Sequence, residues 1–175
     1  SHEGKERWKL DAGIGGNPLV YDINKDGTPV ILIGVGVNLT VLDAKGAVDW
    51  TYPMQREMDG ALTVADANED GEVEIYVVDL AGKMVCLSPA GQLRWEADVE
   101  ERVRRSPSVG DVDGDGIQEI LVAGYSNTVH VFEPDGRLDA GLSAPGGINS
   151  TATLLPLMDG APGILLTPLT VSFLF

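Results

Sequence analysis

The chain has 175 residues, of which 43% are hydrophobic and 22% are charged, as in an ordinary folded globular protein. Its 27 acidic residues outnumber its 12 basic ones and give a formal net charge of −15, which argues against a nucleic-acid partner and attracts cations. The lone cysteine, Cys86, excludes an intrachain disulfide.

The chain begins with a short segment, residues 4–10, that looks like the last strand of a repeating unit. A glycine followed four residues later by a tryptophan occurs three times, ending at Trp8, Trp50 and Trp95. A further copy, residues 136–140, ends in alanine. Because a large ring with one polar atom suits a half-buried joint, we predict that these tryptophans pack between neighbouring repeats.

Three acidic loops follow the same period. They are residues 22–27 (DINKDG), 66–71 (DANEDG) and 111–116 (DVDGDG), whose first residues lie 44 and 45 positions apart. A degenerate fourth copy lies at Asp159-Gly160. Each loop precedes an apolar run without alternation, namely 30–33, 75–78, 120–123 and 164–166. Such runs predict strands that are covered on both faces.

The repeat predicts four short strands in each unit. In the second copy these strands are 61–65, 74–78, 84–88 and 93–96. Four antiparallel strands in 44–45 residues match one blade of a β-propeller. We therefore expect an all-β fold in which residues 1–175 form a single domain of about four four-stranded blades, covering approximately 17–52, 60–97, 105–140 and 150–175.

Two arrangements of these blades are compatible with the sequence. The N-terminal strand, 4–10, completes the last blade and closes a four-bladed ring, which removes exposed sheet edges. Alternatively, the chain is a fragment or half of a seven- or eight-bladed ring, and a homodimer then becomes an option. The apolar end, 163–175, is too short for a membrane helix and contains Pro168, so we expect no membrane insertion.

The acidic loops have the pattern of calcium sites. Calcium takes six to eight oxygen ligands, and side chains at loop positions 1, 3 and 5, a carbonyl at position 7 and a carboxylate at position 9 supply them. In the third loop these are Asp111, Asp113, Asp115, Ile117 and Glu119. In the second they are Asp66, Asn68, Asp70, Glu72 and Glu74, and in the first Asp22, Asn24, Asp26 and Thr28.

The first loop has Val30 at position 9, so we expect a weaker site there and two or three bound Ca²⁺ in all. The simpler alternative is a set of plain turns, since Asp, Asn and Gly also suit turns without metal. Three copies in register, each at the start of the same type of strand, favour the metal. An EF-hand is excluded, because it needs a glutamate at position 12, where this chain has Ile33, Val77 and Val122.

The stretches 109–122 and 64–75, VGDVDGDGIQEILV and VADANEDGEVEI, resemble FG-GAP/VCBS repeats, as in integrin α-subunit propellers and many bacterial surface proteins. A weaker likeness links residues 41–50 to the repeats of quinoprotein propellers. The first resemblance implies that the metal loop joins the first two strands of a blade and that calcium stiffens the propeller. It also implies that partners bind on the opposite face.

No catalytic constellation is apparent, so we expect a protein that is not an enzyme. His130 has no nucleophilic partner in the sequence, and no phosphate loop or zinc spacing occurs. We expect an extracellular, cell-surface or periplasmic recognition and adhesion module for a protein or glycan. The alternatives are a non-catalytic accessory propeller of a larger polysaccharide-degrading or redox enzyme, and a structural spacer. The candidate ligand face comprises Tyr52, Arg56, Arg102, Arg104, Tyr125 and Asn149.

Overall fold

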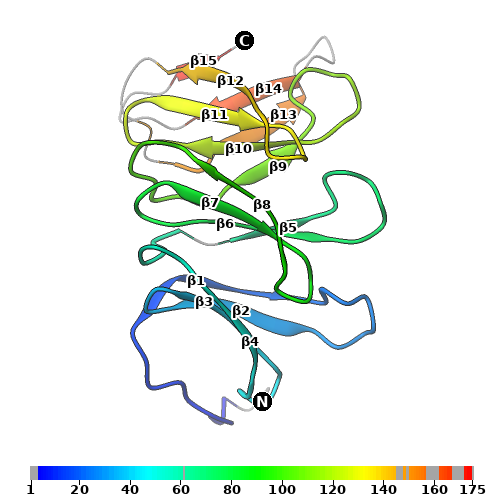
Figure 1. Ribbon diagram of the computed structural model, residues 1–175, viewed down its shortest axis with the longest axis vertical. Helices are drawn as coiled ribbons and strands as arrows, with labels where there is room; N and C mark the ends of the chain where they lie inside the picture. Colours follow the sequence, from blue (N-terminus) through cyan, green and yellow to red (C-terminus); the bar gives the residue numbers. More distant parts are fainter. Residues whose placement is uncertain are drawn as a thin grey trace.

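The computed structural model describes residues 4–60, 62–144, 148, 150–156, 162–166 and 172–174. Within these ranges the regular structure consists of fifteen β-strands in four antiparallel sheets and contains no helix. The sheets stack face to face in chain order, so that each sheet is one blade (Figure 1). The all-β propeller prediction is confirmed, and no helix in the described ranges has the length to span a membrane.

Each blade is an antiparallel meander whose strands pair in sequence order. The first blade contains β1 (Ile14–Tyr21), β2 (Val30–Val35), β3 (Asn38–Leu42) and β4 (Val48–Pro53). The second contains β5 (Thr63–Ala65), β6 (Glu74–Val78), β7 (Lys83–Leu87) and β8 (Leu93–Asp98). The third contains β9 (Ser108–Gly110), β10 (Glu119–Ala123), β11 (Thr128–Phe132) and β12 (Leu138–Ser143). The last sheet contains β13 (Thr153–Pro156), β14 (Pro162–Leu166) and β15 (Ser172–Leu174).

Burial follows the position of a strand within its blade. Every residue of β6 and of β10 is buried, because these second strands lie between two neighbouring sheets. The fourth strands, β4, β8 and β12, instead share one pattern in which exposed and half-buried residues alternate from the second residue onward, and the first residue is exposed as well. This difference explains why the apolar runs of the sequence lack alternation only in the inner strands.

The core is divided into layers between blades rather than gathered at one centre. Ile75 and Val77 of β6 join the apolar cluster against the first blade, whereas Tyr76 and Val78 of the same strand join the cluster against the third. This split follows from the alternation of side chains along a strand. Cys86 lies in the second cluster, and burial raises the pKa of its thiol to about 12, so it is an inert core residue.

The tryptophans connect each blade to the next one along the chain. The indole Nε1 of Trp50 donates a hydrogen bond to a carbonyl in the turn between β7 and β8, and Trp95 does the same in the turn between β11 and β12. The carbonyls belong to Pro89 at 3.1 Å and Pro134 at 2.8 Å. The prediction that these side chains pack between blades is confirmed.

Each tryptophan ring lies against a glycine of the turn that it contacts. These glycines are Gly46, Gly91 and Gly136, and all three have positive φ angles of 85°, 75° and 88°. A Cβ added at any of them would lie only 2.6–2.8 Å from the tryptophan ring. The glycine is therefore required both by the turn and by the ring that covers it.

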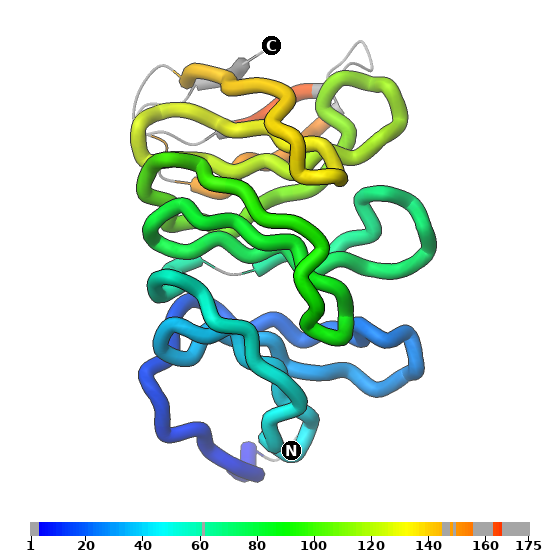
Figure 2. The backbone as a smooth tube through the Cα atoms, viewed as in Figure 1, coloured from blue at the N-terminus to red at the C-terminus, as the bar shows by residue number. Residues whose placement is uncertain are grey.

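Of the two arrangements compatible with the sequence, the closed four-bladed ring is not the one observed. Residues 4–10 do not pair with the last sheet, whose order is β13-β14-β15 in the described residues. Trp8 instead lies against Gly46 and donates to the carbonyl of Ala44 at 3.1 Å. The N-terminal segment thus covers the first blade as Trp50 covers the second, and the stack stays open with the first and last blades at its two ends (Figures 1 and 2). The alternative, a partial propeller, is the arrangement observed.

Candidate metal-binding loops

The three acidic loops join the first and second strands of the first three blades and project from the same edge of the stack (Figure 2). The turns between second and third strands and the connections between blades lie on the opposite edge (Figure 1). An antiparallel meander requires this division, since consecutive connections alternate between the two ends of the strands. The edge with the acidic loops is hereafter the loop edge, and the other is the connection edge.

All three loops have left-handed residues at the same two positions. Position 4 has a positive φ in each, at Lys25, Glu69 and Gly114, with values of 54°, 56° and 84°. Position 6 is glycine with a φ of 84°, 89° and 93°, at Gly27, Gly71 and Gly116. Two left-handed residues separated by one position curl each loop tightly, which brings the odd-numbered side chains together.

Backbone N–H groups hold the carboxylates of the third loop in place. Asp111 accepts hydrogen bonds from Gly114 at 2.6 Å and from Gly116 at 3.1 Å. Asp113 accepts the N–H of Asp115 at 3.0 Å, and Asp115 accepts the N–H of Ile117 at 2.7 Å. One oxygen from each aspartate lies within 4.8 Å of the other two. The loop therefore concentrates three carboxylates around one point.

A fourth carboxylate, that of Glu119, stands behind this group. Its side chain is only 3% exposed, and it accepts the N–H of Val112 at 2.8 Å. Burial raises the pKa of Glu119, and the negative charges of the three loop aspartates raise it further. Among the described residues, no basic side chain forms an ion pair with Asp111, Asp113 or Asp115. A hard divalent cation fits this donor set.

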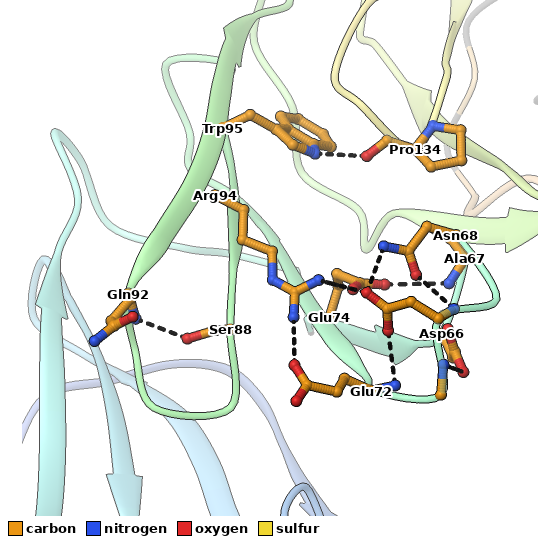
Figure 3. Close-up of polar contacts among 12 residues, drawn as sticks. Asp66, Ala67, Asn68, Glu72, Glu74, Ser88, Gln92, Arg94, Trp95 and Pro134 are labelled. Carbon is orange, nitrogen blue, oxygen red and sulfur yellow. Dashed lines mark hydrogen bonds and ion pairs between the residues drawn. The ribbon is translucent and has the colours of Figure 1, made fainter.

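The second loop repeats the turn but carries a cation of its own. Asp66 accepts the N–H of Gly71 at 3.0 Å, and Asp70 accepts the N–H of Glu72 at 2.8 Å. The guanidinium of Arg94 contacts Glu72 and Glu74, as Figure 3 shows, and it also contacts Asp70. Burial raises the pKa of Glu74, while its hydrogen bond from Ala67 and the charge of Arg94 act in the opposite direction.

The first loop has fewer carboxylates than the other two. Asp22 accepts the N–H of Gly27 at 2.8 Å, and Asp26 accepts the N–H of Thr28 at 2.7 Å. Val30 takes the place of the buried glutamate and is itself buried. The Nζ of Lys25 reaches the Gly71 carbonyl of the second loop. A weaker first site stays a prediction, as do the carbonyl ligands of all three loops.

Residues 103–132, which contain the third loop with β10 and β11, match the family model of the FG-GAP repeat. The chain is a partial β-propeller whose third blade is an FG-GAP repeat. No curated protein sequence matches the chain.

Solved structures agree on the propeller fold. The biofilm matrix protein Bap1 of V. cholerae is 21% identical, with a TM-score of 0.62 over 85% of this chain and 23% of Bap1. BBS1N in complex with ARL6DN is 14% identical, with a TM-score of 0.61 over 95% of this chain and 48% of BBS1N. BamB of Moraxella catarrhalis is 18% identical, with a TM-score of 0.63 over 96% of this chain and 51% of BamB. The partial propeller thus spans about half or less of each.

The candidate ligand residues of the propeller are divided by their exposure. Arg56, Arg102 and Arg104 are exposed, and Tyr125 is 66% exposed. Tyr52 is half-buried and packs against the apolar cluster between the first and second blades. Asn149 lies outside the described residues. The first four residues are therefore the part of the predicted face that is open to a partner.

Sequence reasoning missed two features of the propeller. Arg94 was not assigned to the second loop, although the repeat gives a signal, since the positions 45 residues before and after it are Asp49 and Asp139. The second feature is the contact between His130 and Glu101. The Nε2 atom of His130 lies 2.7 Å from the Oε1 atom of Glu101. The side chain of His130 is 17% exposed.

Proposed function

We propose that this partial propeller is a calcium-binding recognition module without catalytic activity, stabilised by calcium in the third acidic loop. The observation that carries the proposal is the convergence of Asp111, Asp113 and Asp115, whose ligand oxygens lie within 4.8 Å of one another beside the buried Glu119. Three carboxylates held this closely, with the buried Glu119 beside them, repel one another, and a divalent cation removes that repulsion.

Calcium suits the donor set better than magnesium. The loop offers the carboxylates of Asp111, Asp113, Asp115 and Glu119 and the carbonyl of Ile117, and calcium accepts many protein oxygens in a flexible geometry. Magnesium prefers few protein ligands and retains its waters. When bound, calcium supplies charge neutralisation and cross-links the start of β10 to the loop before it. Binding to the folded state alone raises stability in proportion to the logarithm of the calcium concentration.

An extracellular or cell-surface location agrees with this site, because free calcium outside cells is high enough to fill loops of moderate affinity. Bap1, which shares the fold, is a biofilm matrix protein. For the partner we favour a protein over a glycan, since BBS1N, another propeller with this fold, forms a complex with ARL6DN. The partner surface in the proposal is the connection edge, where Arg56, Arg102, Arg104 and Tyr125 are exposed.

The calcium proposal is tested by isothermal titration of the purified chain and of Asp115→Asn. Asp49→Asn is the matched control, because Asp49 is also exposed and its substitution removes the same charge outside the loops. We expect Asp115→Asn to lose the tightest calcium site and most of the calcium-dependent rise in Tm, while Asp49→Asn keeps both. Equal calcium binding by the two variants would contradict the proposal.

The recognition proposal is tested with a photo-crosslinking amino acid in the full-length protein on its producing cells. Placed at Tyr125, the probe lies on the connection edge; placed at Ile117, which is 46% exposed, it lies on the loop edge. We expect a discrete protein adduct from position 125 and none from position 117. Adducts from position 117 alone would place the partner surface on the loop edge and would contradict the recognition proposal.

A further inference from the structure

At position 94, on the loop edge, the second blade reverses the charge of its neighbours. Arg94 lies near the start of β8, one residue before Trp95. The residues 45 positions earlier and later are Asp49 on β4 and Asp139 on β12. A basic side chain therefore stands in the second blade where the first and third blades carry an acid.

The guanidinium of Arg94 lies among the carboxylates that the second loop would offer to a metal (Figure 3). Its Nη1 contacts Oε1 of Glu74 and lies 3.5 Å from Oδ2 of Asp70. Its Nη2 lies 3.0 Å from Oε2 of Glu72. Asp70 and Glu74 occupy positions 5 and 9 of the loop, so one side chain from two strands away in the sheet engages both.

The pairing of Arg94 with Glu74 is largely removed from solvent. The side chain of Arg94 is 26% exposed and that of Glu74 only 3%. The second oxygen of Glu74 accepts the N–H of Ala67 at 3.2 Å and the hydroxyl of Tyr76 at 3.3 Å. Every carboxylate oxygen of Glu74 thus has a partner, and the buried charge is balanced without an ion from solution.

Within the part of the chain that the structure describes, the third loop has no such cation. Arg137 lies in the turn just before β12, and it pairs with Glu133 and Asp139 instead of with the loop. Glu119, which corresponds to Glu74, is equally buried. Two loops with the same turn therefore differ in charge: the second has an amide, Asn68, where the third has Asp113, and it contains the guanidinium of Arg94.

One atom of the second loop retains the character of a metal ligand. The Oδ1 atom of Asp66, at position 1, is buried and has no hydrogen-bond partner among the described residues. Arg94 reaches positions 5 and 9 but makes no ion pair with Asp66. The orphaned oxygen points to a loop whose shape still suits a cation and in which the arginine satisfies only part of the donor set.

We propose that Arg94 is the resident cation of the second loop and makes it independent of calcium, so that calcium binds the third loop and not the second. The inference rests on the proposed function for its account of the third loop. A calcium ion in the second loop would have to displace the guanidinium or share its carboxylates with it. Removal of the guanidinium leaves Asp66, Asn68, Asp70 and Glu74 free to bind the metal.

The test is calcium stoichiometry, measured by equilibrium dialysis, for the parent chain, Arg94→Gln and Arg137→Gln. The control loses the same positive charge from the exposed surface of the third blade. We expect Arg94→Gln to bind one more calcium ion than the parent, and the control to bind the same number. Adding Asp66→Asn to Arg94→Gln should abolish the extra ion. An unchanged stoichiometry for a folded Arg94→Gln overturns the inference.

A second measurement does not depend on whether Arg94→Gln folds. Asp66→Asn in the parent background should leave the number of bound calcium ions unchanged, and the loss of an ion would show that the second loop binds calcium despite Arg94. The two proposals fail separately. A parent that binds calcium lost in Asp115→Asn, together with no gain in Arg94→Gln, overturns only the role of Arg94. No calcium in the parent and one ion in Arg94→Gln overturns only the third-loop site.

Discussion

The second and third blades carry the same repeat 45 residues apart, yet their charged residues differ at two sites, one on the loop edge and one on the connection edge. On the loop edge the second blade places Arg94 among its carboxylates, and the third blade has Asp139 at that position. On the connection edge the carboxylate that accepts the turn N–H groups comes from position 79 in the second blade and from position 101 in the third. The comparison shows that the two blades share the same turns but carry their charged side chains at different positions of the repeat.

The buried carboxylate of the second blade belongs to the blade itself. Asp79 is fully buried at the end of β6. Its Oδ1 accepts the N–H groups of Ala81 at 2.9 Å and Lys83 at 3.0 Å, and its Oδ2 accepts the N–H of Arg56 at 2.9 Å. One side chain therefore closes the turn between β6 and β7 and ties it to the connection from the first blade.

In the third blade the carboxylate comes from the preceding connection. Gly124 replaces Asp79, and a Cβ added there would lie 2.0 Å from the carboxyl group of Glu101. Glu101 accepts the N–H of Ser126, which corresponds to Ala81, at 2.6 Å, and it contacts His130. The acid thus lies at the strand end in the second blade and in the connection in the third, where the second blade has Arg56, and the turn N–H groups have a carboxylate acceptor in both blades.

The largest expected effect tests whether the carboxylates of Asp79 and Glu101 are equivalent. Asp79→Gly leaves three N–H groups without their acceptor and should lower the free energy of unfolding by about 3 kcal/mol. Adding Arg56→Glu recreates the arrangement of Glu101 and Gly124, so it should recover part of the loss. Urea unfolding of both single variants and the double variant measures the coupling, with Arg56→Gln as the control. Strictly additive effects would mean that the two carboxylates are not equivalent.

The second largest expected effect concerns the contact of Trp95 with Gly136, between the second and third blades. Gly136→Ala places a methyl group 2.6 Å from the ring of Trp95 at a φ of 88° and should cost about 2 kcal/mol. Gly141→Ala is the matched control, because its Cβ would meet Thr128 at an ordinary 3.6 Å. Thermal unfolding compares the two variants. If both change Tm equally, the tryptophan contact does not set the packing of the third blade on the second.

Transferring the arginine sharpens the contrast between the two loops. Asp139→Arg gives the third blade the residue of the second, and it should weaken calcium binding tenfold or more, equivalent to about 1.4 kcal/mol. Asp139→Asn removes the same acid without adding a cation and serves as the control. Titration calorimetry measures both affinities. Equal calcium affinities for Asp139→Arg and Asp139→Asn would show that a positive charge at this position does not weaken calcium binding.

The smallest expected effect depends on pH. Burial alone would raise the pKa of Glu101, but the hydrogen bonds from Ser126 and His130 outweigh it and hold the pKa below its usual range. The stability that this carboxylate contributes is therefore complete above a pH of about 4.5 and is lost as the pH falls through its lower folded-state pKa. Glu101→Gln should cost about 1 kcal/mol at neutral pH and less at pH 3.

The control for this last prediction is Glu100→Gln, since Glu100 is exposed and adjacent in sequence. Urea unfolding at several pH values should give nearly parallel curves for the control and the parent, and a flatter acid limb for Glu101→Gln. A constant difference between Glu101→Gln and the parent from pH 7 to pH 3 would contradict the ionised state of Glu101 as the source of the stabilisation.

Local chemistry was sufficient to predict the blades from the sequence. The 44–45-residue period, the glycines at position 6 of each loop and the apolar runs after them specify four short strands per repeat, since turn residues and strand patterning act over a few neighbours. The same holds for the packing role of Trp50 and Trp95, and for the concentration of carboxylates at Asp111, Asp113 and Asp115. These features depend on spacing along the chain.

Tertiary structure decided the features that depend on the distance between residues remote in sequence. Arg94 meets Glu74 only because β6 and β8 begin at the same edge of a sheet, and Glu101 fills the space over Gly124 only because a connection crosses that turn. Whether the ring closes also depends on contacts between residues remote in sequence. Trp8 covers the first blade rather than completing the last, and the direction in which a tryptophan docks on a glycine turn is a property of packed sheets that spacing does not encode.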